Sequence, residues 1–500
     1  MEKKIVLLPL DERPCNALFP QKLLAGSGVR VVTPACLGNK KQAADVDGLI
    51  EFLTRECADA DGLILSMDML LYGGLLPSRL HRMDDRVIAH QLETVGALRR
   101  RYPALTIYAF QCIMRCPSYS SDDEEPDYYE QYGEQIHLSG VLKHRHMLGL
   151  CDEEELSEVC EKIPPEALKD YLDRRAFNLK YNKLTLELVK EGAIDFLVVP
   201  QDDSAPYGYT AMDQQQVRDE IRRLRLQTKA LMYPGADEVG LTLLSRMLLH
   251  FAGRTPGVYL KYAAHDAPRT VPLYEDRTLG ETVKYHLMAA GCRTADRQSE
   301  ADFVLALSAP AGQMRESVLQ PVTDAGYCVE RNLAEFVSCI RDHVLSGGMV
   351  SVCDNAYANG ADLELVDMLD QLALLDKLAG YAGWNTSANS LGTAIAQGVC
   401  ALLFGMDESR KDFLMLRYME DAGYCAVVRR YITENCLEKM GMDYFDVKDE
   451  RGAMSGEVRS RLESFIDRYI PSLKGHISLE DVRMPWRRMF ETDLTVRWKP

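Results

Sequence analysis

Residues 196–204, FLVVPQDDS, join a buried-looking apolar run to a polar cluster, and this junction is the pattern that decides the fold. Four other stretches repeat it: 5–16 (IVLLPLDERPCN), 62–74 (GLILSMDMLLYGG), 230–238 (ALMYPGADE) and 348–360 (GMVSVCDNAYANG). In parallel α/β proteins, ligands bind at the carboxyl ends of the strands, because the following loops converge there. The five clusters therefore predict one shared polar site and an enzyme.

Short apolar runs alternate with amphipathic segments from residue 5 to about residue 400, which predicts a repeated βα pattern and an α/β fold. Several of the runs are apolar throughout, as expected for parallel strands that are covered on both faces. Strands are expected at 5–10, 29–33, 62–67, 105–112, 195–200, 229–234, 257–262, 302–308, 348–353 and 380–384. Helices are expected at 40–58, 84–102, 210–227, 237–252, 278–290, 330–346, 361–377 and 387–402.

Six strands before residue 250 and two later ones favour a parallel-sheet, TIM-barrel-like domain over residues 1–255, because a ring gathers many strand ends around one site. Two open doubly wound sheets are the alternative. Residues 117–190 form a charged, helical insertion, expected either to cover the active face or to be a surface subdomain. A smaller doubly wound unit, Rossmann-like or flavodoxin-like, is predicted over 256–404, and a helical region over 405–500.

The composition is that of a globular protein, with 500 residues, 47% of them hydrophobic, and a net charge of −17. So acidic a chain disfavours nucleic acid as a partner. No apolar run has the length of a membrane span or a secretory leader, and the fourteen cysteines are scattered without a CxxC pair. These features predict a reduced, cytoplasmic protein that does not bind membranes. They leave the oligomeric state open, a homo-oligomer included.

Paired acidic residues follow two successive strands, one pair at 202–203 and the other at 237–238. Two carboxyl groups close together raise the pKa of one and leave the other ionised, as a general acid and its partner require. Each acid has the simpler alternative role of capping the next helix or of lying in its first turn. The predicted catalytic residues are Asp202, Asp203, Asp237 and Glu238.

Polar and aromatic residues at the other strand ends are expected to bind the substrate. Arg13 is suited to a bidentate contact with an anion or to orienting a carboxylate. Trp384 and Asn385 suit the apolar face and the hydroxyl rim of a sugar, although Trp384 is equally typical of a core and Asn389 of a helix cap. The predicted substrate-binding residues are Asp11, Arg13, Asn16, Asp68, Tyr72, Arg79, Arg115, Asp354, Asn359, Trp384, Asn385 and Asn389.

Binding a divalent metal is the alternative role for these carboxylates, because Mg²⁺ and Mn²⁺ prefer oxygen ligands. The candidate ligands are Asp11, Asp68, Asp202 and Asp237. The favoured interpretation needs no metal and no other cofactor. The sequence has no phosphate-binding GxxxxGK[ST] or GxGxxG loop in context, and neither GxSxG nor HExxH. Nucleotide binding, serine-hydrolase chemistry and a zinc site are therefore disfavoured.

Eight motifs occur in order along the chain: PLDERPCN (9–16), SMDMLLYGGLLPSR (66–79), IMRCP (113–117), QDDSAPYG (201–208), YPGADEVG (233–240), DNAYANGAD (354–362), YAGWNTSANSLGTA (381–394) and PWRRMFE (485–491). Together they resemble the bacterial domain of unknown function 4127 family over nearly the whole chain. That resemblance does not imply any particular activity. An Asp–Asp pair at a strand end, with Asn and Trp from elsewhere, is also similar to the retaining hexosaminidases that use the substrate's acetamido group, in a different order and spacing.

The favoured function is a glycoside hydrolase that acts on a small glycoside or oligosaccharide through paired carboxylates. The second hypothesis is a divalent-metal-dependent hydrolase or lyase that uses the same carboxylates as ligands. The third is a non-catalytic sugar-binding or regulatory protein. All three require that polar groups remote in sequence meet in one cavity.

Overall fold

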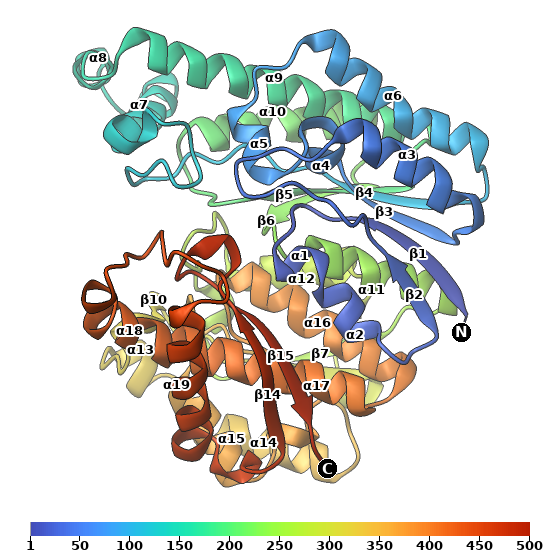
Figure 1. Cartoon of the computed structure of the whole chain (residues 1–500), viewed down its shortest axis with the longest axis vertical. Helices are drawn as coiled ribbons and strands as arrows, with labels where there is room; N and C mark the ends of the chain where they lie inside the picture. The colour runs from blue at the N-terminus through green and yellow to red at the C-terminus, as the bar shows by residue number, and fades with distance from the viewer. Residues whose placement is uncertain (1) are drawn as a thin grey trace.

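Two open parallel sheets form the frame of the computed structural model, which describes residues 2–500. Figure 1 shows the six-stranded sheet in its upper half and β7, a strand of the other sheet, in its lower half. The upper sheet has six strands in the order β2 (Val29–Val32), β1 (Lys3–Leu8), β3 (Gly62–Ser66), β4 (Thr106–Phe110), β5 (Phe196–Gln201), β6 (Ala230–Pro234). The lower sheet has five strands in the order β13 (Gly380–Ala382), β11 (Val350–Cys353), β9 (Phe303–Leu307), β7 (Gly257–Tyr262), β8 (Arg293–Thr294).

The predicted barrel is wrong, and the alternative of two open doubly wound sheets is confirmed. β2 and β6 are the edges of the upper sheet and do not pair with each other, so no barrel closes among the described strands. β7 and β9, which a barrel would have needed, pair with each other in the lower sheet. In each sheet the strand order changes direction once. In the upper sheet β2 and β3 pair with opposite edges of β1, and in the lower sheet β8 and β9 pair with opposite edges of β7.

All ten predicted strands and all eight predicted helices are present. β3, β5 and β6 are buried along their whole length, because helices cover both faces of the upper sheet. Above it in Figure 1 lie α3 (Val46–Glu56), α6 (Asp85–Arg101), α9 (Pro165–Lys190) and α10 (Tyr209–Leu224). Below it lie α1 (Pro14–Ala17), α2 (Phe19–Leu24), α11 (Val239–Ala252) and α12 (Leu279–Ala289). Two short helices, α4 (Met67–Tyr72) and α5 (Leu75–Leu80), follow β3.

The insertion predicted at 117–190 begins as a loop and continues as three helices, α7 (Tyr129–Met147), α8 (Glu153–Cys160) and α9. α9 packs against β5, α6 and α10, and so belongs to the helical layer of the upper sheet, while α7 and α8 project beyond its end (Figure 1). Only α7 and α8 therefore stand beside the sheet, and the loop before α7 remains available to approach the carboxyl ends of the strands.

The lower half is completed by helices around its sheet and by the C-terminal region. The helices are α13 (Ala325–Cys328), α14 (Leu333–Leu345), α15 (Leu363–Gln371), α16 (Ser387–Phe404), α17 (Glu408–Arg417), α18 (Arg429–Asn435) and α19 (Ala453–Tyr469), with a π-helix at Tyr418–Val428. A short parallel pair joins β10 (Arg315–Glu316) to β12 (Tyr357–Ala358). The region predicted to be helical, 405–500, also contains an antiparallel hairpin, β14 (Ile477–Arg483) and β15 (Asp493–Trp498), which the prediction missed.

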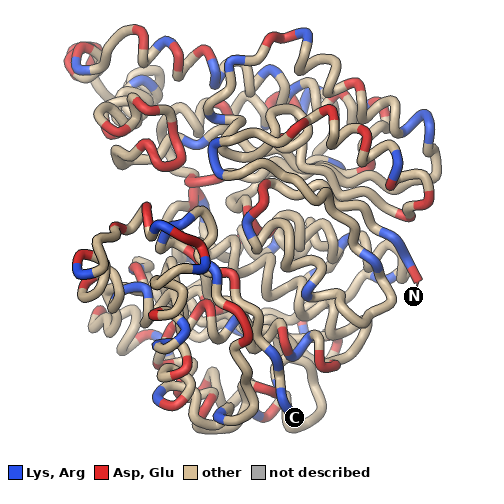
Figure 2. Tube along the Cα trace, in the orientation of Figure 1, with Lys and Arg blue, Asp and Glu red and all other residues tan. Residues whose placement is uncertain are grey.

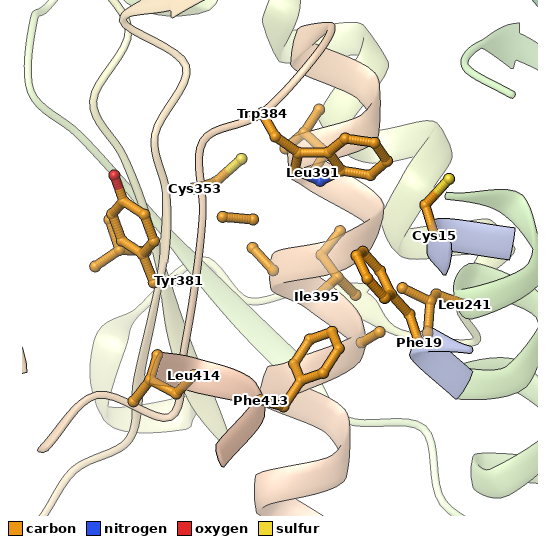
Figure 3. Packing of buried hydrophobic residues seen from close by; sticks show 14 of the residues in the cluster. Cys15, Phe19, Leu241, Cys353, Tyr381, Trp384, Leu391, Ile395, Phe413 and Leu414 are labelled. Carbon is orange, nitrogen blue, oxygen red and sulfur yellow. The ribbon is translucent and has the colours of Figure 1, made fainter. Parts of the chain in front are cut away.

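The two halves pack through α16 against α11 and α12. A glycine on α16 makes the close approach possible, because a Cβ at Gly392 would lie 2.3 Å from Cγ of Glu238 on the neighbouring chain segment. Figure 3 shows the same helix between aromatic residues of both halves, with Phe19 on one side and Tyr381 on the other. α16 is long and apolar enough to cross a membrane, but 83% of it is buried inside the protein, so it serves as a core helix.

A buried carboxyl group at this junction gives the stability of the fold a pH dependence. Glu275 accepts hydrogen bonds from the backbone N–H of Ala388 at 2.8 Å and from the hydroxyl of Thr282 at 3.3 Å, and burial raises its pKa to about 8. Because the folded chain keeps this proton at a pH where the unfolded chain has lost it, the stability falls as pH rises towards 8. The unfolding free energy of Glu275→Gln, taken relative to that of the wild type, should therefore rise by about 2–3 kcal/mol from pH 6 to pH 9. Denaturant unfolding of both proteins at the two pH values measures this change.

Candidate functional site

A cavity of about 350 Å³ lies where loops from the carboxyl ends of both sheets meet. The upper sheet contributes residues that follow β1, β3, β4, β5 and β6, and the lower sheet contributes residues that follow β7, β11 and β13. Eight of the predicted site residues line it: Arg13, Arg79, Arg115, Asp202, Asp203, Asp237, Asn359 and Asn385. Four of the five polar clusters thus share one site, and the cluster at 62–74 does not reach it.

A groove of about 1010 Å³ between α7, α9 and α10 is larger, but it contains none of the strand-end residues. Its walls are helical side chains such as Leu172, Leu179 and the stems of Lys143 and Lys183. A catalytic site requires groups of fixed geometry and perturbed pKa, which the smaller cavity provides. We therefore assign the candidate site to the cavity between the sheets.

One end of the cavity is built around Arg13, which links the first and last strands of the upper sheet. Its guanidinium donates to Asp11 at 2.7 Å and to both oxygens of Asp237 at 2.5 and 3.2 Å. The amide of Asn16 donates to the same two carboxylates at 2.9 and 3.0 Å. Trp486 covers the guanidinium at 4.8 Å. Asp11 and Asn16 therefore lie behind the cavity wall, where they fix Arg13 and Asp237.

The other end holds the Asp202–Asp203 pair, each member tied to one arginine. Oδ2 of Asp202 accepts from Arg79 at 2.7 Å, and Oδ2 of Asp203 accepts from Arg115 at 3.0 Å. No donor among residues 2–500 reaches the second oxygen of either carboxyl, and their side chains keep 20% and 23% exposure. Burial, and then the charge of Asp203, raise the pKa of Asp202. Two adjacent carboxyls therefore each keep one oxygen for a ligand.

Two acids of the insertion loop hold the arginines in place. Glu125 accepts from Arg79 at 3.2 Å and from Arg115 at 2.8 Å, and Glu124 accepts from Arg115 at 2.9 Å and from Arg488 at 2.6 Å. Although burial raises the pKa of Glu124, these guanidinium groups lower it well below its usual value. Figure 2 shows acidic and basic segments side by side where the two halves face each other. The arginines are thus neutralised by the protein itself.

Four residues of the cavity wall have positive φ without being glycine: Asp203 (46°), Tyr274 (67°), Asn359 (61°) and Asn385 (49°). This backbone region is costly for residues that carry a Cβ, and such strain concentrates at functional sites. Glycine would adopt these angles without strain, so the side chains at these four positions are needed for the site. The amide of Asn385 reaches Asp237 at 3.5 Å, and that of Asn359 donates to Glu316 at 2.9 Å.

Asp354 lies outside the cavity and organises the loop that carries Asn359. Its oxygens accept from the hydroxyls of Ser308 and Tyr381, both at 2.7 Å, and from the backbone N–H of Asp362 at 2.7 Å. Burial raises its pKa to about 6. Asp354 therefore ties the DNAYANGAD loop to neighbouring segments, and Asn359 is the residue of this motif that lines the cavity.

Four more predicted site residues lie outside the cavity. Glu238 is completely buried between α11 and α16, where it contacts His286 at 3.2 Å. Asp68 accepts from the backbone N–H of Cys112 at 2.9 Å, and burial raises its pKa to about 7. Tyr72 stacks on His81 with ring centroids 4.5 Å apart. The side chain of Asn389 is buried at the start of α16.

Trp384 is a core residue and not a sugar platform. Its ring lies 6.1 Å from that of Phe19, its indole N–H donates to Thr393 at 3.2 Å, and Figure 3 shows it inside the cluster around α16. The loop turns after β13 so that Asn385 lines the cavity while Trp384 points into the core.

Removing the ring should therefore affect the stability of the fold and not the cavity. Trp384→Ala is expected to cost about 3–5 kcal/mol of unfolding free energy, because a large buried side chain is deleted. Trp384→Phe keeps most of the packing, and it should bind a ligand of the cavity as the wild type does. Denaturant unfolding and ligand-binding measurements on the same preparations test both statements, and a selective loss of sugar binding in the phenylalanine variant would restore the sugar-platform role.

Several cavity residues were not predicted as site residues. Most come from the loop before α7 and from the C-terminal region, while Tyr274 follows β7 and Thr386 follows β13. The residues are Ser118, Tyr119, Ser121, Asp123, Glu124, Glu125, Tyr274, Thr386, Tyr444, Phe445, Arg488 and Phe490. The PWRRMFE motif, which contains Arg488 and Phe490, was the available signal for two of them. Aromatic residues thus do line the cavity, but from segments with no strand-end pattern.

The carboxylates named as metal ligands do not converge. Asp11 and Asp237 share Arg13, Asp202 pairs with Arg79, and Asp68 accepts from a backbone N–H. Within residues 2–500, no group of three or more His, Cys, Asp or Glu side chains is arranged to hold a metal ion. The residues present do not fit a divalent-metal centre.

Comparison with protein families gives a match to the family described as a protein of unknown function (DUF4127), over residues 5–495. No curated protein matches the chain. The match spans both sheets and the C-terminal region, so the whole cavity lies within it.

Proposed function

The chain belongs to the DUF4127 family, and we propose that it is a glycosidase-type hydrolase that acts on a small glycoside or oligosaccharide in the cavity between the sheets. The observation that carries the proposal is the Asp202–Asp203 pair, in which each carboxyl is held through one oxygen and offers the other. Glycoside hydrolysis in most families needs two such carboxyl groups, one protonated and one ionised.

Asp202 is the general acid in this proposal, because burial and the charge of Asp203 raise its pKa. It gives its proton to the leaving oxygen as the glycosidic bond breaks. Asp203 either takes a proton from the water that attacks the anomeric carbon, or attacks that carbon itself. In the second case Asp202, now ionised, takes a proton from a water that attacks the anomeric carbon and releases Asp203. A carboxyl separation of about 5–5.5 Å in the substrate complex corresponds to retention, and about 6.5–9.5 Å to inversion.

The rest of the cavity supports a neutral, hydroxyl-rich ligand. Each lining arginine already has a carboxylate partner, so no surplus positive charge is left to select an anion. Paired arginines, carboxylates and amides present donors and acceptors side by side, which suits vicinal hydroxyls. Tyr119, Tyr274, Tyr444 and Phe490 add apolar faces for the C–H side of a sugar ring. Asp237 and Asn385 would orient the hydroxyls.

The setting of the proposed enzyme is the cytoplasm. All fourteen cysteines are free thiols, several of them buried, which is the form that a reducing compartment maintains. The proposed partner is a small carbohydrate.

A panel of α- and β-linked glycosides and disaccharides, followed by NMR for product release, tests the proposal. We expect turnover of at least one member, with no loss after EDTA treatment. Activity that EDTA abolishes and Mg²⁺ or Mn²⁺ restores would favour the metal-dependent hydrolase. If nothing is turned over and a sugar raises the melting temperature, the protein is a sugar binder.

A further inference from the structure

A second cavity, of about 280 Å³, adjoins the candidate site. The two cavities share Asn359, Tyr444 and Phe490 as lining residues. The second lies over the end of the π-helix and the start of α18, and it is open to solvent near Thr433 and Glu434. A ligand that fills the candidate site and passes these three shared residues would enter the second cavity.

Two of the three residues between the cavities, Asn359 and Phe490, are fixed by hydrogen bonds. Arg429 donates to the backbone carbonyl of Asn359 at 2.6 Å and to that of Phe490 at 2.7 Å. Glu316 accepts from the amide of Asn359 and from the hydroxyl of Tyr274, which lines the candidate site. Hydrogen bonds from Arg429 and Glu316 therefore fix this boundary, as a binding site for an extended ligand requires.

We propose that the adjoining cavity is a second sugar subsite, which binds the unit on the far side of the cleaved bond. This inference rests on the proposed glycosidase function. A cavity of about 350 Å³ is at the lower end of the range of about 300–1,000 Å³ for ligand pockets, and the second cavity adds room for another ring. Its chemistry repeats that of the first: aromatic faces from Tyr444 and Phe490, and a polar rim that includes the ion pair of Arg430 and Glu434 at 3.0 Å.

The substitution Thr433→Trp tests the subsite by filling it. Thr433 is exposed on α18, and its hydroxyl bonds only within the helix, to the carbonyl of Arg429 at 2.8 Å, so the fold should tolerate the change. Asn435→Trp is the matched control, since Asn435 is exposed on the same helix and does not line the cavity. Equal melting temperatures of the two variants would establish that they are equally folded.

Three substrates with the same glycosyl unit separate the possible occupants: a glycosyl fluoride, a disaccharide and a 4-nitrophenyl glycoside. The fluoride has a leaving group too small to reach the second cavity. Thr433→Trp should lower kcat/KM for the disaccharide at least tenfold and leave the fluoride unchanged, while Asn435→Trp changes neither. The sugar subsite would be overturned by an unchanged kcat/KM for the disaccharide, by an equal loss of kcat/KM for the fluoride, or by a loss confined to the nitrophenyl glycoside.

Binding measurements keep this test separate from that of the proposed function. If the wild type turns over none of the three substrates, the glycosidase proposal fails on its own. Calorimetry with the disaccharide and the corresponding monosaccharide then decides about the subsite. Tighter binding of the disaccharide that Thr433→Trp abolishes supports it, and equal affinities, or no binding of either sugar, overturn it.

Discussion

Asp203→Asn is expected to lower kcat by about 10²–10⁴-fold, the contribution of a positioned acid–base group, with a nearly unchanged melting temperature. Asparagine tolerates the left-handed backbone at this position and still accepts a hydrogen bond from Arg115, so the loop should keep its shape. What is lost is the charge that assists attack on the anomeric carbon. Steady-state kinetics and thermal melting on the same preparation test the expectation.

The pH profile gives this variant a second readout. Because the charge of Asp203 helps to raise the pKa of Asp202, its removal should move the residual activity of the variant to lower pH. Asp213→Asn is the matched control, since Asp213 also pairs with an arginine, Arg175 at 2.6 Å, but lies outside the cavity. That control should keep both its rate and its pH profile. Full activity of Asp203→Asn would remove Asp203 from the mechanism.

Arg13→Ala is expected to destabilise the fold by about 3–5 kcal/mol, because it leaves Asp11 and Asp237 buried without their cation. The loss also removes the guanidinium over Trp486, which connects the first strand to the C-terminal region. Guanidinium chloride unfolding measures the change.

An exposed ion pair provides the comparison for this effect. Arg497 and Asp412 lie 2.8 Å apart with the arginine side chain 57% exposed, and Arg497→Ala should change the stability by no more than about 1 kcal/mol. If Arg13→Ala destabilises no more than this control, the buried network is not a structural element of the site.

The sequence predicted the elements of this fold better than their arrangement. Strands such as 196–200 and 302–308 are evident because runs that are buried on both faces must be apolar throughout. The choice between a barrel and two open sheets depends on which strands pair, and periodicity carries no information about pairing. β7 joins β9 instead of closing a ring with β6, and no local feature of 257–262 predicts this.

The candidate site could be predicted where its residues follow strands. Asp202, Asp203 and Asp237 were found because the carboxyl end of a parallel strand has a known position. Trp384 was ambiguous for the same reason, since a residue after a strand can turn inward as easily as outward. Arg488 was missed because it reaches the cavity through a long-range return of the chain, which is fixed by its ion pair with Glu124.

The proposed function depends most on the cavity between the sheets being the place where a sugar binds. A crystal structure of Asp203→Asn with a glycoside that the wild type hydrolyses tests this directly. We expect the sugar in the cavity, with its glycosidic oxygen within hydrogen-bond distance of Asp202. A sugar bound in the groove between α7, α9 and α10, with the cavity vacant, would refute the proposal.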